Sequence, residues 1–509
     1  MKTVKILAAW VLLAALLIPS LGLTSCSTPP TGPGEEGSQS AEGSVTSEQT
    51  QETETGRESI ADNLPDGLTF SGETVCVLTR SGDEDTRREF LVDEDASDLV
   101  SSAVHERNTQ VEDRLDIEIE IIESTDTRHA GTVINQLLAK TVSAGSDEYD
   151  LISNHMSQAT SALIAGYYAD MAGYEYLDQD MPWWNSSYAY EITVEGHQYL
   201  AVGELSLSYI SGMYAMFFNK TLWEETRKAD ELYDLVRAQK WTFDKLAEFT
   251  NDFNRDLNGD GRLDGDDICG LYYQKPMLAS DALAFAANIK FITHTGDGEY
   301  EFVLNNERTI EFVEKMRRIL FENNGVIMEN TGARIIMEKL SRNTALFTVG
   351  MLGDTTYLRS MEDDYGIIPL PKLNEAQASY TGQAHDGSSA FGMPNTVRNG
   401  DMVAAFLEAM SAESYRRVTH AYYDNALKVQ YARDPVFAEM MDLISASVTF
   451  DFAVVYNPTL GSPASCFRDM FTDPTKIGAA SSTFKSMERG TQNSIRNLIR
   501  TIQKNTERQ

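Results

Sequence analysis

The stretch Ile117-Glu118-Ile119-Glu120-Ile121-Ile122 alternates apolar and acidic side chains at first, which is the pattern of a β-strand with one buried face. Helical periodicity follows over residues 131–144, and Tyr149-Asp150-Leu151-Ile152-Ser153 indicates a further strand. Upstream, a strand over 73–79 precedes a helix over 96–115. Strands that alternate with helices in this way predict parallel βαβ units and an α/β fold.

Two loops follow predicted strands at one edge of this sheet, residues 80–83 and 154–157. In open α/β sheets, ligands bind outside the carboxyl ends of the strands. Arg80, Asn154 and His155 are therefore candidate ligand-binding residues. Alternatively, His155 caps the helix that follows it.

Further motifs come in a characteristic order along the chain. Trp183-Trp184-Asn185 precedes residues 196–204, Gly-His-Gln-Tyr-Leu-Ala-Val-Gly-Glu, and a strand-like segment over 213–218 ends in Asn219-Lys220. Residues 343–347, Asn-Thr-Ala-Leu-Phe, and 364–372, Asp-Tyr-Gly-Ile-Ile-Pro-Leu-Pro-Lys, follow. From about residue 70 to the C-terminus, this order resembles that of bacterial extracellular solute-binding proteins of family 1, the maltose-binding type.

The resemblance implies a type II periplasmic-binding-protein-like fold, with two α/β lobes and a ligand cleft between them. It implies the substrate-binding component of an ABC importer, which captures a sugar or oligosaccharide and delivers it to a permease. The expected chain crossings lie near residues 199–206, 373–383 and 430–437, before a C-terminal run of helices. The expected lobes are residues 70–200 with 378–430 (lobe 1) and 205–375 with 435–509 (lobe 2).

The N-terminus has the order of an export signal. A lysine-containing start precedes an apolar run over residues 6–23, and Leu23-Thr24-Ser25-Cys26 completes it with small residues. This tetrapeptide resembles a bacterial lipobox, so we expect residues 1–25 to be a signal peptide and Cys26 to carry a lipid. Alternatively, an ordinary signal peptide is cleaved here and the mature protein is released. Residues 26–62 are acidic with few apolar side chains, which predicts a disordered tether to the extracellular face of the cell membrane.

Charge and cysteine usage narrow the class of protein. The formal net charge of −35 argues against nucleic-acid binding, because phosphate neutralisation needs a basic surface. About 445 residues remain beyond the tether, enough for two or three lobes with their own cores. Cys76, Cys269 and Cys466 have no metal-binding spacing and allow at most one disulfide. We expect a monomer whose partners are a small solute, the permease subunits and a membrane.

The sharpest local motif is residues 256–267, Asp-Leu-Asn-Gly-Asp-Gly-Arg-Leu-Asp-Gly-Asp-Asp. It fits a twelve-residue calcium loop, with side-chain oxygens at positions 1, 3, 5, 9 and 12 and a glycine at position 6. The predicted ligands are the side chains of Asp256, Asn258, Asp260, Asp264 and Asp267 and the carbonyl of Arg262. Asp267 departs from the pattern, which has glutamate there, and the alternative is a surface turn without metal. We expect a structural Ca²⁺ rather than a calcium sensor.

Sugar sites combine flat aromatic surfaces with amides and carboxylates. In the two-lobe arrangement, the candidates of these types are Asn154, His155, Trp183, Trp184, Glu204 and Asp386, together with Gly353 and Asp354 after a second-lobe strand. Alternatively, the two tryptophans belong to the core, Glu204 is a hinge residue paired with a backbone donor, and Asp386 belongs to a turn. At most one of the two adjacent tryptophans is expected to face the cleft.

An enzyme is the weaker interpretation. The sequence has no His-Glu-x-x-His, Gly-x-Ser-x-Gly, P-loop or Cys-x-x-Cys motif. Two catalytic carboxylates leave no fixed local signature, so an exported glycoside hydrolase remains an alternative. A cell-surface adhesion protein is the other. We therefore expect a binding protein that is not an enzyme.

Overall fold

The computed structural model describes residues 56–93, 96, 98–275, 279–295, 299–424 and 436–507. The chain divides into two compact units, residues 1–53 and 54–509, and all described residues belong to the second. The predicted signal peptide and Cys26 therefore lie outside the described residues. Within the described ranges, no helix has the length and apolar character to cross a membrane.

The first sheet has four strands in the order β12-β3-β1-β2. Their bounds are β1 (Glu73–Arg80), β2 (Ile117–Ser124), β3 (Leu151–His155) and β12 (Ser389–Gly392). β1 pairs in parallel with β2 and with β3, which confirms the predicted parallel units, and β12 is antiparallel to β3.

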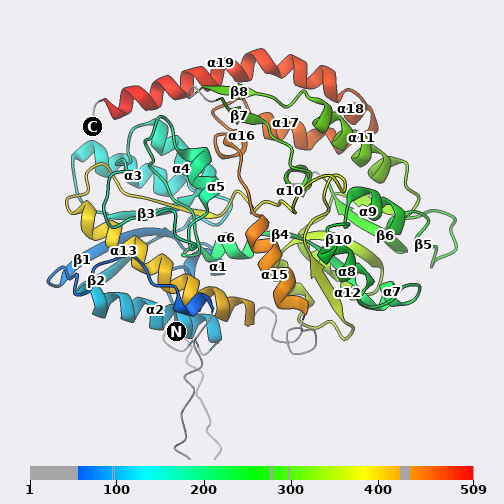
Figure 1. The fold of residues 1–509 in the computed structure, drawn as a ribbon, viewed down its shortest axis with the longest axis horizontal. Helices are drawn as coiled ribbons and strands as arrows, with labels where there is room; N and C mark the ends of the chain where they lie inside the picture. Colours follow the sequence, from blue (N-terminus) through cyan, green and yellow to red (C-terminus); the bar gives the residue numbers. More distant parts are fainter. Residues whose placement is uncertain are drawn as a thin grey trace, which may run out of the picture. The chain divides into compact units, whose positions relative to one another are not determined.

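Helices cover both faces of this sheet. They are α2 (Leu99–Leu115), α3 (Thr132–Ala144), α4 (Met156–Ile164) and α13 (Gly400–Glu413). Figure 1 shows α2 on the side of the sheet opposite to α3 and α4. α2 begins at Leu99 rather than at residue 96, because the Asp98 carboxylate accepts the N–H groups of Val100 and Ser101 and caps the helix there.

β3 extends further along the chain than predicted. Asn154 and His155 belong to the strand and not to a loop, since they pair with Ala390 and Ser389 of β12. This partner strand lies more than 200 positions away, so no local pattern could indicate the extension.

The second sheet is mixed, in the order β11-β4-β10-β6-β5, with β9 also paired to β6. Its strands are β4 (Tyr214–Asn219), β5 (Asn254–Arg255), β6 (Ile268–Gln274), β9 (Val326–Glu329), β10 (Ala345–Met351) and β11 (Tyr365–Ile368). The helices of this part are α7 (Lys220–Glu224), α8 (Glu231–Arg237), α9 (Phe243–Thr250), α10 (Ala279–Ala286), α11 (Glu307–Phe321) and α12 (Ala333–Ser341). A separate hairpin consists of β7 (Ile292–His294) and β8 (Tyr300–Phe302).

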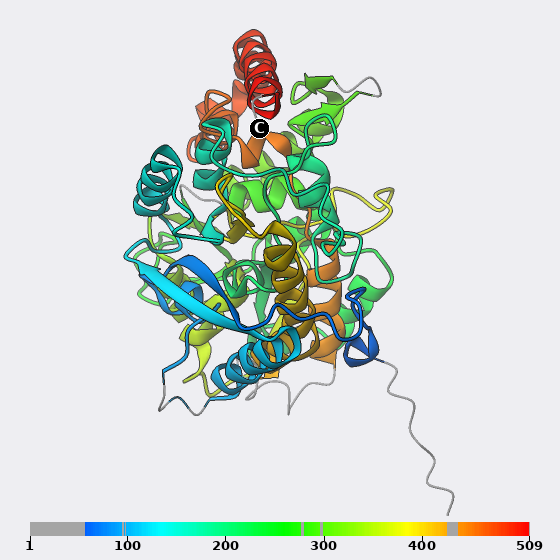
Figure 2. The same cartoon turned by 90° about the vertical axis from the view of Figure 1, so that its left-hand side faces the viewer.

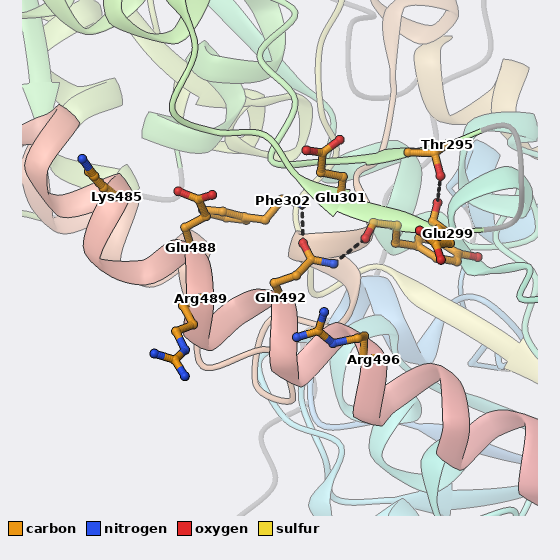
Figure 3. Close-up of a pocket in the computed structure, with 10 residues that line it drawn as sticks. Thr295, Glu299, Glu301, Phe302, Lys485, Glu488, Arg489, Gln492 and Arg496 are labelled. Atoms are coloured by element: carbon orange, nitrogen blue, oxygen red, sulfur yellow. Dashed lines mark hydrogen bonds between the residues drawn. The ribbon is translucent and has the colours of Figure 1, made fainter.

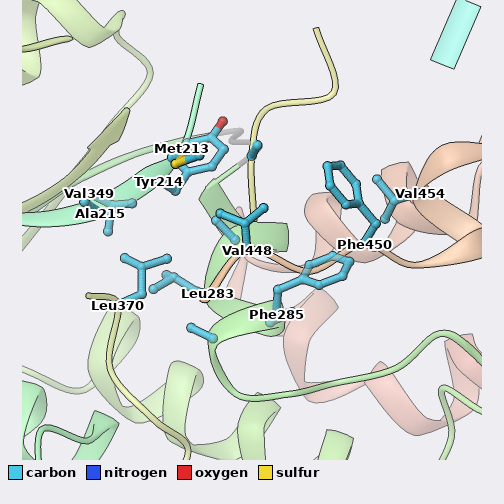
Figure 4. Packing of buried hydrophobic residues seen from close by; sticks show 14 of the residues in the cluster. Met213, Tyr214, Ala215, Leu283, Phe285, Val349, Leu370, Val448, Phe450 and Val454 are labelled. Atoms are coloured by element: carbon cyan, nitrogen blue, oxygen red, sulfur yellow. The ribbon is translucent and has the colours of Figure 1, made fainter. Parts of the chain in front are cut away.

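The chain passes between the two sheets in three places. Isolated β-bridges join Ala201 to Phe391 and Met213 to Ala384, which ties the first and second crossings together. The third expected crossing, residues 430–437, lies largely outside the described residues. After α15 (Val436–Ser447), Val448 and Phe450 pack beside Phe285 of α10 (Figure 4). The strands of the first sheet all fall in the residues predicted for lobe 1, and those of the second sheet in the residues predicted for lobe 2, so we keep these names.

The predicted C-terminal helices are present as α16 (Phe452–Val455), α17 (Pro463–Met470), α18 (Pro474–Gly478) and α19 (Ala480–Thr506). α19 contacts both lobes. The Gln492 amide donates to the carbonyl of Tyr300 in β8 at 2.7 Å, and the Asn505 amide donates to the carbonyl of Ile164 in α4 at 2.7 Å. Residues 435–509 therefore do not belong to lobe 2 alone.

Residues 56–62, assigned by their composition to the disordered tether, are packed against lobe 1. Arg114 of α2 binds both oxygens of Asp62 at 2.7 Å, and Arg416 binds one of them at 3.0 Å. Burial alone would raise the pKa of Asp62, but hydrogen bonds and charge from the two arginines outweigh it and lower the pKa to about 2. The partners are remote in sequence, so composition could not indicate this packing.

A fully buried glutamate joins the first sheet to the first crossing. The Glu89 carboxylate accepts hydrogen bonds from Ser153 of β3 (3.3 Å), from Ser389 of β12 (2.6 Å), from Ser206 of the first crossing (3.1 Å) and from Ser208 just after it (2.6 Å). The backbone N–H of Ser208 donates to it as well, at 3.1 Å. Burial raises the pKa of Glu89, which the nearby Arg80 and the serine donors partly counteract.

Glu89→Ala should lower the free energy of unfolding by about 3 kcal/mol or more, because several buried donors lose one acceptor together. Glu89→Gln should cost less, since serine hydroxyls can rotate to accept from an amide. Urea denaturation measures the free energy of unfolding of both variants. The control is Glu106→Ala on the exposed face of α2, which should change this free energy by less than about 0.5 kcal/mol. Equal losses in the alanine variants would contradict the role of Glu89.

Candidate functional site

The carboxyl ends of β1 and β3 in lobe 1 and of β10 in lobe 2 lead to one region at the second crossing. His385 N donates to Gly212 O at 2.8 Å, and Arg80 Nη2 donates to Gly387 O at 2.9 Å. A Cβ added at Gly353, after β10, would lie 3.2 Å from Ser211 Cβ. The polar side chains gathered here, called the strand-end site below, are those of Arg128, His129, His155, Asp281, Asp354, His385, Asp386 and Arg468.

Three histidines form one side of the strand-end site. The rings of His129 and His385 meet edge to face with centroids 5.3 Å apart, and His385 Nδ1 lies 3.4 Å from an oxygen of Asp386. Burial lowers the pKa of His155 to about 4 and that of His385 to about 3, and it also lowers the pKa of His129. Nδ1 of His155 accepts the N–H of Ser157 at 3.2 Å, and Nδ1 of His385 accepts the N–H of Gly387 at 2.8 Å. In both rings Nε2 is therefore the nitrogen that can make a further hydrogen bond, as a donor.

Arg128 connects the loop after β2 to the segment before β4. Its Nη2 donates to the carbonyl of Ser208 at 3.1 Å and to the hydroxyl of Ser211 at 2.9 Å. Asp85 lies 3.5 Å from its Nη1 and accepts the Ser211 hydroxyl at 2.7 Å. The guanidinium of Arg128 is therefore held by two neutral acceptors, on Ser208 and Ser211, and by the carboxylate of Asp85.

Two buried carboxylates come from lobe 2. Arg468 of α17 donates to Asp281 of α10 at 2.5 Å and lies 3.9 Å from Asp386. The second oxygen of Asp281 is buried and has no hydrogen-bond partner among the described residues. Burial raises the pKa of Asp281 to about 7 and that of Asp354 to about 6, in each case against the influence of a nearby arginine. The site thus holds unused hydrogen-bonding capacity away from water.

The predicted residues Asn154 and Arg80 lie beside this site, but their side chains form hydrogen bonds within the protein. Asn154 donates to Asn135 Oδ1 at 2.9 Å, and a Cβ at Gly131 would collide with its amide oxygen. Arg80 is fully buried and donates to the carbonyls of Thr127 and Gly387 and to the Ser389 hydroxyl. The geometry gives Arg80 a positioning role in place of the predicted ligand contact.

His155 and Asp354 each cap a helix as well as facing the site. His155 Nδ1 accepts the N–H of Ser157 at 3.2 Å at the start of α4, which agrees with the capping alternative. Asp354 accepts the N–H of Met351 at 2.8 Å. His155, Asp386 and the Gly353-Asp354 pair are thus the predicted residues that the fold brings together.

Trp183 and Trp184 are not at the strand-end site. Both belong to the core of lobe 1, and their indole N–H groups donate to Glu408 of α13 at 3.0 and 2.9 Å. Burial raises the pKa of Glu408 to about 7. Both tryptophans therefore agree with the alternative that they are core residues, and neither offers an aromatic face to a sugar at the strand-end site.

Glu204 lies near the tryptophans, at a separate cavity of about 280 Å³. Arg57 donates to both of its oxygens, at 2.9 and 3.1 Å, and the guanidinium lies 4.2 Å above the ring of Tyr415. The partner of Glu204 is therefore a side chain from the N-terminal segment, in place of the backbone donor that the hinge alternative expected. Burial raises the pKa of Glu204 against the charge of Arg57.

The calcium-like loop is closed by its own side chains. Asp256 accepts the N–H groups of Gly259 and Gly261, and Asp267 accepts those of Leu257 and Asp264. Hydrogen bonds from the backbone lower the pKa of Asp256. Among the described residues, no three His, Cys, Asp or Glu side chains are placed to hold a metal ion, at this loop or at the three histidines.

Several site residues escaped the sequence analysis. Arg128 and His129 follow β2, and Arg80 is the last residue of β1, so the strand-end rule could have found the first two as well. Asp281 and Arg468 are joined only by the tertiary fold, and no local pattern marks either residue.

No family model matches the sequence, and no curated protein matches it. Solved structures do match the fold. UgpB from Mycobacterium tuberculosis, in complex with glycerophosphocholine, is 14% identical over 82% of this chain and 98% of that one, with a TM-score of 0.52. A cyclo/maltodextrin-binding protein complexed with maltotetraose is 12% identical over 84% and 97%, with a TM-score of 0.51. The maltose-binding protein MalE from Listeria monocytogenes, in complex with maltose, is 13% identical over 86% and 98%, with a TM-score of 0.50. The described chain therefore has the two-lobe α/β fold of the type II, maltose-binding class of solute-binding proteins.

Proposed function

We propose that this protein is the solute-binding component of an ABC importer, which captures a solute outside the membrane and delivers it to a permease. The observation that carries the proposal is the strand-end site, where polar groups of both lobes meet at the second crossing. A solute held there contacts both lobes, so it stabilises their closed arrangement. This role requires binding without turnover, and the protein is then not an enzyme.

A sugar or oligosaccharide fits the chemistry of the site. Nε2 of His155 and of His385 can donate to hydroxyl groups, and Asp281 keeps one oxygen without a partner among the described residues that can accept from them. The similar fold of proteins solved with maltose and maltotetraose supports the same class.

A thermal-shift screen of the purified chain with Cys26→Ser tests the function against sugars, oligosaccharides, amino acids and polyamines. One sugar class should raise the melting temperature, because a ligand at a hundredfold its Kd adds about 2.7 kcal/mol to the folded state. The solute should be recovered intact. Asp386→Ala and His155→Ala should weaken its binding at least tenfold in calorimetry, since each leaves a buried solute group without a partner.

Trp184→Phe is the control, because it alters the tryptophan cavity and leaves the strand-end site unchanged. A cleaved sugar would favour the glycoside hydrolase, and no shift with any solute would favour the adhesion protein. Loss of binding in Trp184→Phe alone would move the solute site to the tryptophan cavity.

We propose that Cys26 carries the lipid that anchors the protein to the extracellular face of the membrane. The lipobox-like tetrapeptide and the acidic stretch after it support this proposal. A radiolabelled fatty acid should be incorporated into the wild-type chain and not into Cys26→Ser, which should be released from the membrane fraction. Equal labelling of both chains would contradict the assignment.

We propose that the loop over residues 256–267 binds calcium, which would draw its side-chain oxygens to one centre. The support is the ligand spacing and the bond from Gly261 N to Asp256, which folds the loop back at its glycine. Millimolar Ca²⁺ should raise the melting temperature of the wild type, because it binds only the folded loop. Asp256→Asn with Asp260→Asn should abolish that rise, and Mg²⁺ should not reproduce it. An unchanged melting temperature in the wild type would leave the surface-turn alternative.

A further inference from the structure

The longest helix of the described chain, α19, is net basic, whereas the protein as a whole is net acidic. The full sequence has 77 acidic and 42 basic residues, yet α19 holds five basic side chains and a single acidic one, Glu488. The basic residues, called the α19 stripe below, are Lys485, Arg489, Arg496, Arg500 and Lys504. All five are exposed.

The spacing places the α19 stripe on one side of the helix. Successive members are separated by four, seven, four and four positions, each close to a whole number of turns at 3.6 residues per turn. The buried side chains of the helix, such as Phe484, Ile495 and Ile502, lie roughly opposite. Figures 1 and 2 both show α19, in red, at the top edge of the molecule.

Few protein groups neutralise this charge. Among the described residues, none of the five cations forms an ion pair within 4 Å. A groove of about 710 Å³ separates the helix from the β7–β8 hairpin. Its lining includes Glu299, Glu301 and Glu488 and also three members of the stripe, Lys485, Arg489 and Arg496. Figure 3 shows Arg489 directed away from that hairpin, while Gln492 makes the hydrogen bonds across the groove. The five exposed cations form a row about 28 Å long, three of them at the edge of this groove.

We infer that the α19 stripe docks the protein on a surface of anionic phospholipid headgroups. A row of exposed cations along one helix matches a flat array of phosphates, and each cation near such a surface strengthens binding severalfold. The large exposed apolar residues of the described chain all lie outside α19, so an aromatic-anchored protein interface is not indicated there.

The inference draws on the proposed lipid anchor, which would supply the high local concentration that a weak electrostatic contact needs. Extended, the roughly 30 residues between Cys26 and the described chain reach at most about 100 Å, so they allow any face to turn to the membrane.

The test is sedimentation of the purified full-length Cys26→Ser chain with phosphatidylglycerol or phosphatidylcholine vesicles at 50 and 300 mM salt. The acyl chain is then absent, so the result does not depend on the anchor. Binding should require phosphatidylglycerol and should fall at least fivefold at the higher salt. The triple variant Arg489→Glu, Arg496→Glu, Arg500→Glu should lose at least tenfold in affinity.

The matched control is Lys228→Glu, Lys240→Glu, Arg359→Glu, three exposed cations outside α19 whose reversal changes the net charge equally. It should bind as the parent does. Thermal melting and solute binding, measured on both variants, should be unchanged, which separates this inference from the transport proposal. Equal losses in the two triple variants, or equal sedimentation of the parent with both lipids, would overturn it.

Discussion

The arrangement of the two lobes depends on one buried carboxylate. Glu89 comes from the segment after β1, yet its oxygens accept hydrogen bonds from β3, from β12 and from the first crossing, which leads into lobe 2. A carboxyl group buried in this way is tolerated only where its hydrogen bonds are complete, and here five donors surround it. The position of lobe 1 relative to the crossings is thus set by polar geometry as well as by apolar packing.

The sequence indicated the fold well where the signal was local. Alternating strands and helices predicted the parallel core of lobe 1, and the order of motifs indicated the two-lobe class. What it missed came from tertiary pairing. The extension of β3 through His155 needs β12, and the packing of residues 56–62 needs Arg114 and Arg416. Neither partner is visible in a window of neighbouring residues.

The candidate site was predicted in the same uneven way. The rule that ligands gather at strand ends predicted His155 and the Gly353-Asp354 pair, which the fold brings to one region, and it would also have pointed to Arg128. The expectation that an aromatic side chain contacts the sugar does not describe Trp183 and Trp184 at this site. Both indole N–H groups donate to the buried Glu408, which makes the two residues part of the core. The sequence alone does not show that Glu408 lies beside them. The pairing of Asp281 with Arg468 depends wholly on how α10 and α17 pack.

The contact between Arg57 and Glu204 has a mechanical consequence. Glu204 lies in the first crossing, and Arg57 is among the first described residues. A pull transmitted along the chain from the N-terminal side is therefore passed to a segment that joins the two sheets, and not to the outer end of either lobe.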